Sequence, residues 1–201
     1  MHRFAAACLF ILAGFPALAG ELDFAKDGII HEIDLDLWPD SLSPAPAHFF
    51  TELSTAGGRF ALAAKPLSDI QDMFGGTMQS AESVGYRYQW LCYLAAGQRV
   101  WFFEDAEVVD WVVAEPSNPE TDADYGCTAQ PLAALTSDAF PAIGATLGDL
   151  AAQFDWPLEP NTDRVVYFSQ LDDGSLTRTV YYRLRDGIVD GVSFAQWRAD
   201  R

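Results

Sequence analysis

The chain matches itself when it is shifted by 80 residues, and this internal match constrains the fold more than any other feature of the sequence. Residues 60–114 align with residues 140–194 without a gap, and nine of the 55 pairs are identical. Most of the identical residues are apolar or flank turns, which are the positions that fix a fold. We interpret the match as a tandem duplication. The alternative is coincidence between two segments of similar strand composition.

Each half begins with a pattern of two short helices. In the first half the predicted helices cover residues 45–56 and 67–74, and in the second half they cover residues 130–137 and 147–154. Along the second helix of each half, apolar residues recur at positions i, i+3 and i+7, which places them on one helical face. These residues are Leu67, Ile70 and Phe74 in the first half and Leu147, Leu150 and Phe154 in the second.

Three strand-like runs follow the helices in each half. Hairpin-type turn sequences such as Asp186-Gly187 separate them. The predicted strands are 84–94, 98–103 and 108–114 in the first half, and 164–171, 176–184 and 188–194 in the second. The fold class that we predict is therefore α+β, with two tandem helix-helix-three-strand antiparallel repeats plus an N-terminal hairpin. The helices of each repeat are expected on one face of its sheet.

These patterns also divide the chain into segments. The first repeat is expected at 46–114 and the second at 130–201, and a Pro- and Asn-containing linker at 115–129 connects them. The N-terminal hairpin and its own linker occupy residues 20–45, behind a signal peptide at 1–19.

The first residues indicate export. A short positive region is followed by an apolar run, Phe4 to Phe15, that is too short to span a bilayer, and then by the cleavage box Ala17-Leu18-Ala19. We therefore expect a periplasmic or secreted protein without a membrane anchor. Cleavage after Ala19 removes Arg3 and leaves 11 basic against 29 acidic residues, a net charge of −18. Such a surface repels nucleic acid and anionic lipid, and favours basic partners.

Two cysteines, Cys92 and Cys127, remain after the predicted cleavage. In an oxidising compartment two cysteines pair more readily than they stay free, so we predict a disulfide between them. Their spacing is not the Cys-x-x-Cys pattern of redox proteins. The predicted bond ties the linker at 115–129 back to the first strand of the first repeat.

The element order and the sequence Asp186-Gly187-Ile188-Val189 at the last strand carry a resemblance to known proteins. A two-helix, three-strand unit of this kind resembles the BamE-like outer-membrane assembly domain, and two such units in tandem resemble the β-lactamase inhibitor protein family. The resemblance covers roughly residues 46–201. It implies a protein that binds other proteins and is not an enzyme. The chain lacks the lipid-bearing cysteine of the first group and the second disulfide of the other, so no residue role is carried over.

No catalytic motif, cofactor or metal site is predicted. The mature histidines are His31 and His48, and no Gly-x-Ser-x-Gly sequence provides a nucleophile for them. Two acidic groups have a weak likeness to calcium ligands but lack the full spacing, and a solvated surface explains them equally well. They are Glu32, Asp34 and Asp36, and Glu120, Asp122 and Asp124. A hydrolase built on two carboxylates stays open as a weaker alternative.

The aromatic residues of the strands predict a binding surface. Side chains alternate between the two faces of a strand, and we expect a helix-free face that carries large aromatic residues and arginines. Such residues dominate protein-binding hot spots. The predicted surface consists of Arg87, Tyr93, Trp101, Phe103, Trp111, Tyr181 and Arg183. The alternative is that the other sheet or the N-terminal hairpin covers this face.

The function that these observations favour is an exported, non-enzymatic protein-binding module: an inhibitor, an assembly accessory or an envelope factor. Its partner would be an envelope or extracellular protein. The alternative function is a small-molecule or lipid-binding protein with a pocket between the helices and the sheet. That pocket would be lined by Phe60, Phe74, Trp90 and Phe102.

Overall fold

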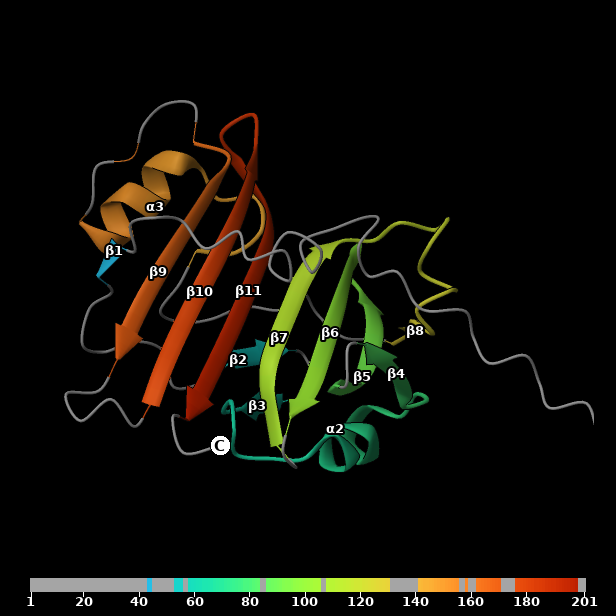
Figure 1. Cartoon of the computed structure of the whole chain (residues 1–201). Coiled ribbons are helices and arrows are strands. Elements are labelled where there is room, and N and C mark those ends of the chain that lie inside the picture. Colours follow the sequence, from blue (N-terminus) through green and yellow to red (C-terminus); the bar gives the residue numbers. More distant parts are fainter. Residues whose placement is uncertain are drawn as a thin grey trace, which may run out of the picture.

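The computed structural model places two helices and eleven strands along the part of the chain that it describes (Figure 1). The described residues are 43–44, 53–55, 58–83, 86–105, 108–130, 141–155, 158, 162–170 and 176–198. The helices are α2 (Leu67–Phe74) and α3 (Leu147–Phe154). Their bounds confirm the helices predicted at 67–74 and 147–154.

One large sheet organises the fold. Its strand order is β1-β9-β10-β11-β7-β6-β5-β4, and a ninth strand, β8, pairs with β5. The long strands pair antiparallel, whereas the two-residue strands β1 and β8 join their neighbours in parallel. The strands are β1 (Ser43–Pro44), β4 (Gln79–Ser83), β5 (Tyr86–Ala95), β6 (Gln98–Asp105), β7 (Val108–Pro116), β8 (Thr128–Ala129), β9 (Arg164–Gln170), β10 (Leu176–Arg185) and β11 (Ile188–Arg198).

The two halves of the chain meet at the pairing of β7 with β11. Val112 lies opposite Phe194, and Ala114 lies opposite Val192. The strands of the two halves are therefore one continuous sheet, as Figure 1 shows, with β4 to β7 on one side of this seam and β9 to β11 on the other. The α+β class is confirmed, and its sheet is larger than either predicted repeat.

Both helices pack on the same face of this sheet. Leu67 and Ile70 of α2 and Leu150 and Phe154 of α3 are buried in one hydrophobic cluster with side chains of the strands. A carboxylate oxygen of Glu104 on β6 accepts a hydrogen bond from the backbone N–H of Leu67 and so satisfies a free donor at the start of α2. The predicted apolar faces of the two helices are the faces that contact the sheet.

The start of α3 is stabilised by a capping box. Asp149 Oδ2 accepts hydrogen bonds from the backbone N–H of Thr146, at 2.8 Å, and from the Thr146 hydroxyl, at 2.7 Å. In return, Thr146 Oγ1 accepts a hydrogen bond from the backbone N–H of Asp149, at 3.1 Å. These bonds satisfy donors that the first helical turn leaves free.

Replacing Asp149 by Asn is expected to make the protein less sensitive to acid. The hydrogen bonds from the Thr146 backbone and side chain lower the pKa of Asp149 below its ordinary value. A lowered pKa in the folded state stabilises the fold above the unfolded pKa, about 3.9, and this contribution is lost as the pH falls through the folded pKa. Melting temperatures at neutral and strongly acidic pH measure the effect. If the melting temperature fell equally for Asp149→Asn and for the natural protein between neutral and acidic pH, this expectation would be contradicted.

The predicted helix at 45–56 is wrong at its C-terminal end. Residues Leu53–Thr55 form strand β2, which pairs with β3 (Gly58–Phe60), and Thr55 lies opposite Gly58. Gly58, which follows the predicted helix, thus belongs to a strand pair, in which β-branched threonine is favoured. The rest of that helix lies outside the described residues, as do the segments at 1–19, 20–42 and 131–137. The predicted signal peptide and N-terminal hairpin are therefore outside them too.

Strands β5, β6, β7, β9, β10 and β11 lie where the sequence predicts them, but several are longer, and the two-residue strands β1 and β8 were not predicted. β7 continues to Pro116 because it stays paired with β6, and β11 continues to Arg198 because it stays paired with β10. β4 was not predicted. It is short and polar and lies at the end of the strand order, and polar sequences of this kind are common in edge strands because they discourage aggregation.

Candidate functional site

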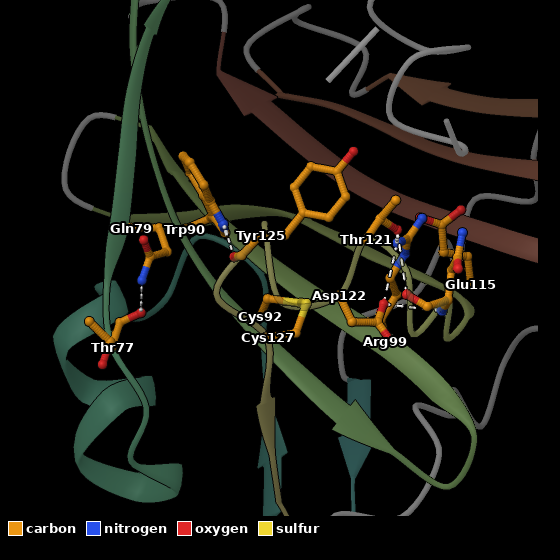
Figure 2. Close-up of a disulfide and its surroundings, with 11 residues drawn as sticks. Thr77, Gln79, Trp90, Cys92, Arg99, Glu115, Thr121, Asp122, Tyr125 and Cys127 are labelled. Atoms are coloured by element: carbon orange, nitrogen blue, oxygen red, sulfur yellow. Dashed lines mark hydrogen bonds and ion pairs between the residues drawn. A yellow bond between two sulfur atoms is a disulfide. The ribbon is translucent and has the colours of Figure 1, made fainter. Parts of the chain in front are cut away.

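The linker between the two halves covers part of the helix-free face of the sheet. Its residues form successive turns, with backbone hydrogen bonds such as Asp122 N–H to Asn118 O, at 2.8 Å, and Cys127 N–H to Asp122 O, at 2.9 Å. Cys127 is joined to Cys92 of β5 by a disulfide, which confirms the predicted pairing (Figure 2). Trp90 also donates its indole N–H to Tyr125 O, at 3.1 Å. The linker is therefore attached to β5 at two neighbouring points.

Arg99 of β6 provides a third attachment. Its side chain is only 3% exposed, and its guanidinium donates to Glu115 Oε1 at 2.8 Å, to Thr121 Oγ1 at 2.8 Å and to Asp122 Oδ1 at 3.3 Å. The same group lies 5.5 Å from the ring centroid of Trp101 and 5.4 Å from that of Tyr125. A buried charge is tolerated only when it is paired and hydrogen-bonded. These contacts meet that condition and hold the linker against the sheet.

The ion pairs continue across the seam between the halves. Glu115 Oε2 lies 3.4 Å from Arg183 Nη1, and Arg183 Nε lies 2.7 Å from Asp190 Oδ1. Asp190 also pairs with Arg185, at 3.3 Å. Positive and negative groups thus alternate from β6 through β7 to β10 and β11. Of this network, the sequence analysis identified Arg183 alone as a site residue. Arg99 directly precedes the apolar run Val100–Phe103, and an arginine in such a position indicates buried acidic partners.

Four of the predicted site residues come together on the helix-free face. Trp101, Phe103, Trp111 and Tyr181 belong to one aromatic cluster there. The ring of Phe103 stacks on Trp111, with centroids 4.4 Å apart, and Trp101 lies 4.6 Å from Tyr125 of the linker. The other members of the cluster are Trp90, Cys92, Val113, Tyr125 and Val166, with Ala81 and Cys127 at its margin.

The expectation that this face is open is wrong for most of the cluster. Trp101 is 1% exposed, Phe103 3% and Tyr181 6%. The physical reason in the first half is the linker, since the ring of Tyr125 packs against Trp101. The disulfide between Cys92 and Cys127 lies near Tyr125 (Figure 2). Trp111 is the one aromatic residue of the predicted surface that is partly exposed.

Tyr93 lies on the opposite face from the one predicted. Its hydroxyl donates to Gly75 O at the end of α2, at 2.7 Å, and its ring contacts Phe74 and Phe102. Burial raises the pKa of Tyr93 to about 12. Residues opposite each other in an antiparallel pair share a face, and Tyr93 lies opposite Val100 of the helix side. For Arg87 the structure gives the backbone position, opposite Glu82 of β4, and its predicted role is not tested.

The residues of the alternative pocket do not line one space. Phe74 and Phe102 lie on the helix side of the sheet, whereas Trp90 belongs to the cluster on the helix-free face. The side chain of Phe60 lies outside the described part of the structure. The prediction of a pocket lined by all four residues is therefore wrong.

Neither a metal site nor a membrane span is found in the described part of the chain. No group of three or more His, Cys, Asp or Glu residues lies there in a position to hold a metal ion. Asp122, one of the acidic linker residues, accepts hydrogen bonds from Arg99 and from the backbone N–H of Asn118. No helix among these residues is long and apolar enough to cross a bilayer. The acidic row at 32–36 and both mature histidines lie outside the described residues.

Comparison with known proteins finds two distant structures. No family model matches the chain, and no curated protein matches it. A DUF4309 family protein (YjgB) from Bacillus subtilis is 14% identical, with a TM-score of 0.36 over 67% of this chain and 80% of that one. A "putative beta-lactamase inhibitor protein" from Streptococcus mutans is 8% identical, with a TM-score of 0.24 over 65% of this chain and 82% of that one. At these scores neither likeness identifies a family or a function.

Proposed function

We propose that the protein is exported and binds another protein through the helix-free face around Trp111, without catalysing a reaction. The observation that carries this proposal is that Trp111 is partly exposed and yet held in one orientation. A tryptophan that is already fixed loses little conformational entropy when a partner packs on it. Tryptophan is also among the residues that contribute most to protein-binding hot spots.

Contacts from both halves of the chain fix Trp111. Its indole N–H donates to Ser193 Oγ of β11 at 2.7 Å, across the seam. Its ring stacks on Phe103, which in turn stacks on Trp101 with centroids 5.8 Å apart. Phe103 and Trp101, which are buried, therefore pack against one another and hold the ring of Trp111 in place. Arg183, whose side chain is 13% exposed, is a second proposed contact, and Arg87 is a third.

The disulfide supports the proposed location. Bonds of this kind persist in the periplasm and outside the cell, where thiols are not kept reduced. The acidic composition of the chain supports a partner with a basic contact surface, since like charges would repel it.

We infer further that residues 60–114 and 140–194 are copies of one unit with one helix and three strands. Two correspondences at the offset of 80 residues support this inference. Both long hairpins shift register at the same position, between Phe103 and Glu104 and between Arg183 and Leu184. The backbone N–H of Val109 donates to Lys65 O, and that of Val189 donates to Ala145 O. We accordingly propose the two repeats at 46–114 and 130–201 as the structural units, joined by the linker at 115–129.

Trp111→Ala is expected to weaken partner binding by about 2 kcal/mol or more, roughly thirtyfold. The mature protein and the variant would be immobilised separately and compared for capture of the same envelope protein, followed by titration of that protein. Met73→Ala is the matched control, because Met73 is a large exposed apolar residue of α2 on the other side of the sheet.

Ser193→Ala tests whether the fixed orientation matters. This change removes the hydrogen bond to the indole but leaves the ring in place, so we expect a smaller loss than for Trp111→Ala. Circular dichroism would first establish that each variant is folded. Equal affinity of Trp111→Ala and Met73→Ala for the captured protein would overturn the proposed site.

A further inference from the structure

Two tyrosine hydroxyls on the helix side of the second half lack hydrogen-bond partners among the described residues. Both Tyr167 and Tyr182 are fully buried, and no polar atom of the described part of the chain lies within hydrogen-bond distance of either hydroxyl oxygen. A buried polar group without a partner costs about 1–3 kcal/mol, so proteins rarely retain one without a reason. Two such groups on neighbouring strands indicate a site that something else completes.

The two tyrosines share one environment beneath α3. The ring of Phe154, at the end of α3, stacks on Tyr167 with centroids 3.4 Å apart and lies 6.3 Å from Tyr182. The rings of Tyr167 and Tyr182 are 6.3 Å apart. Burial raises the pKa of both phenols, and the Tyr167 phenol raises that of Tyr182 further. Both hydroxyls are therefore protonated at neutral pH, and each has a hydrogen to donate.

The first half of the chain offers a direct comparison. There the buried hydroxyl of Tyr93 donates to Gly75 O at the end of α2. A buried tyrosine hydroxyl thus has a backbone hydrogen-bond acceptor under α2, whereas the two hydroxyls under α3 have none among the described residues. The side chains buried in the same cluster are apolar, and no backbone carbonyl of the described residues lies within hydrogen-bond distance of either hydroxyl. These side chains include Leu150, Val165, Val180, Leu184 and Val192.

We propose that the hydroxyls of Tyr167 and Tyr182 form the polar end of an internal binding site, between α3 and the sheet, for a small, neutral, mainly apolar molecule with a carbonyl oxygen. A carbonyl oxygen has two lone pairs and accepts a hydrogen bond from each hydroxyl. A charged ligand is disfavoured, because an ion loses its hydration among apolar side chains. The site lies on the opposite face from Trp111 and does not depend on the proposed protein binding.

The way that α3 is attached indicates how such a molecule would enter. The first turn of α3 is tied to the turn before β11, where the backbone N–H of Leu147 donates to Gly187 O at 2.9 Å. The last turn rests on the sheet through the side chain of Phe154. Movement of the last turn would lift the Phe154 ring from Tyr167 and make room beside the two tyrosines. A bound water molecule is the competing occupant.

The test compares two probes of nearly the same shape. Acetophenone carries the carbonyl oxygen, and α-methylstyrene has a methylene group in its place. Binding of each would be measured by calorimetry and by thermal shift on the natural protein, on Tyr167→Phe/Tyr182→Phe and on Tyr93→Phe. We expect the natural protein and Tyr93→Phe each to bind acetophenone at least about tenfold more tightly than the double variant binds it. α-Methylstyrene should not distinguish the three proteins.

Two further variants keep the proposal falsifiable. Phe154→Ala makes room under α3, so it should bind acetophenone at least as well as the natural protein; if neither protein binds it, the proposal is overturned. Equal binding of acetophenone to the double variant also overturns it. Without ligand, Tyr167→Phe/Tyr182→Phe should be as stable as the natural protein or more stable, because it lacks two unpartnered groups. A less stable double variant would show that water already satisfies the hydroxyls, which also overturns the proposal.

Discussion

Replacing Arg99 by Met is expected to lower the free energy of unfolding by about 3–5 kcal/mol. The change keeps most of the apolar stem but leaves Glu115 and Asp122 as buried carboxylates that have lost their closest cation. An uncompensated buried charge is among the most destabilising defects that one substitution produces. Urea denaturation followed by far-UV circular dichroism measures the loss.

Arg185→Met is the matched control for this change. Arg185 takes part in the same network through Asp190, but its side chain is 74% exposed. Exposed ion pairs contribute little because water screens them, so we expect a change within about 0.5 kcal/mol. A loss below about 1 kcal/mol for Arg99→Met would contradict the view that Arg99 fastens the linker to the sheet.

Removing the disulfide with Cys92→Ala and Cys127→Ala is expected to lower the free energy of unfolding by about 3–4 kcal/mol. The bond closes a loop between residues 35 positions apart, and without it the unfolded chain gains conformational entropy. The linker also loses one of its attachments to β5, so Tyr125 should cover Trp101 less tightly. Urea denaturation measures the first effect, and acrylamide quenching of tryptophan fluorescence measures the second.

Reduction of the natural protein with a thiol reagent is the control for this variant. It breaks the same bond without changing the sequence, so both effects should appear again. Unchanged quenching in the reduced protein would contradict the second effect. It would show that the contacts of Arg99 and the hydrogen bond from Trp90 hold the linker without the disulfide.

Local patterns predicted most of the described elements of the fold. The spacing of Leu67, Ile70 and Phe74 predicts a helix with one apolar face, and α2 has that helix and that face. Glycine-containing turns and runs of β-branched and aromatic residues likewise predicted β6, β9 and β10. These features depend on neighbours in the chain, so the sequence contains the information directly.

The faces of the sheet were harder to predict, because they depend on strand pairing and on what covers each strand. Cys92 lies opposite Trp101 and Trp90 opposite Phe103, which places these four side chains together. Tyr93 then has to lie on the other face, although its residue type suggested the binding surface. A buried tryptophan and an exposed one look alike in a sequence. The disulfide was predicted, but its effect on the exposure of Trp101 requires the path of the linker.

The register of β7 against β11 bears on how such a protein could have arisen. Val112 faces Phe194 while Ala114 faces Val192, and Val113 faces Ser193. At the offset of 80 residues these are reciprocal pairs, the arrangement that a two-fold axis produces between identical strands. If the two halves are copies of one unit, as we propose above, a single ancestral unit would have had its third strand as an open edge, able to pair with the same strand of a second molecule. Fusion of two such genes would convert a symmetric homodimer into one chain, whose two halves are then free to acquire different surfaces.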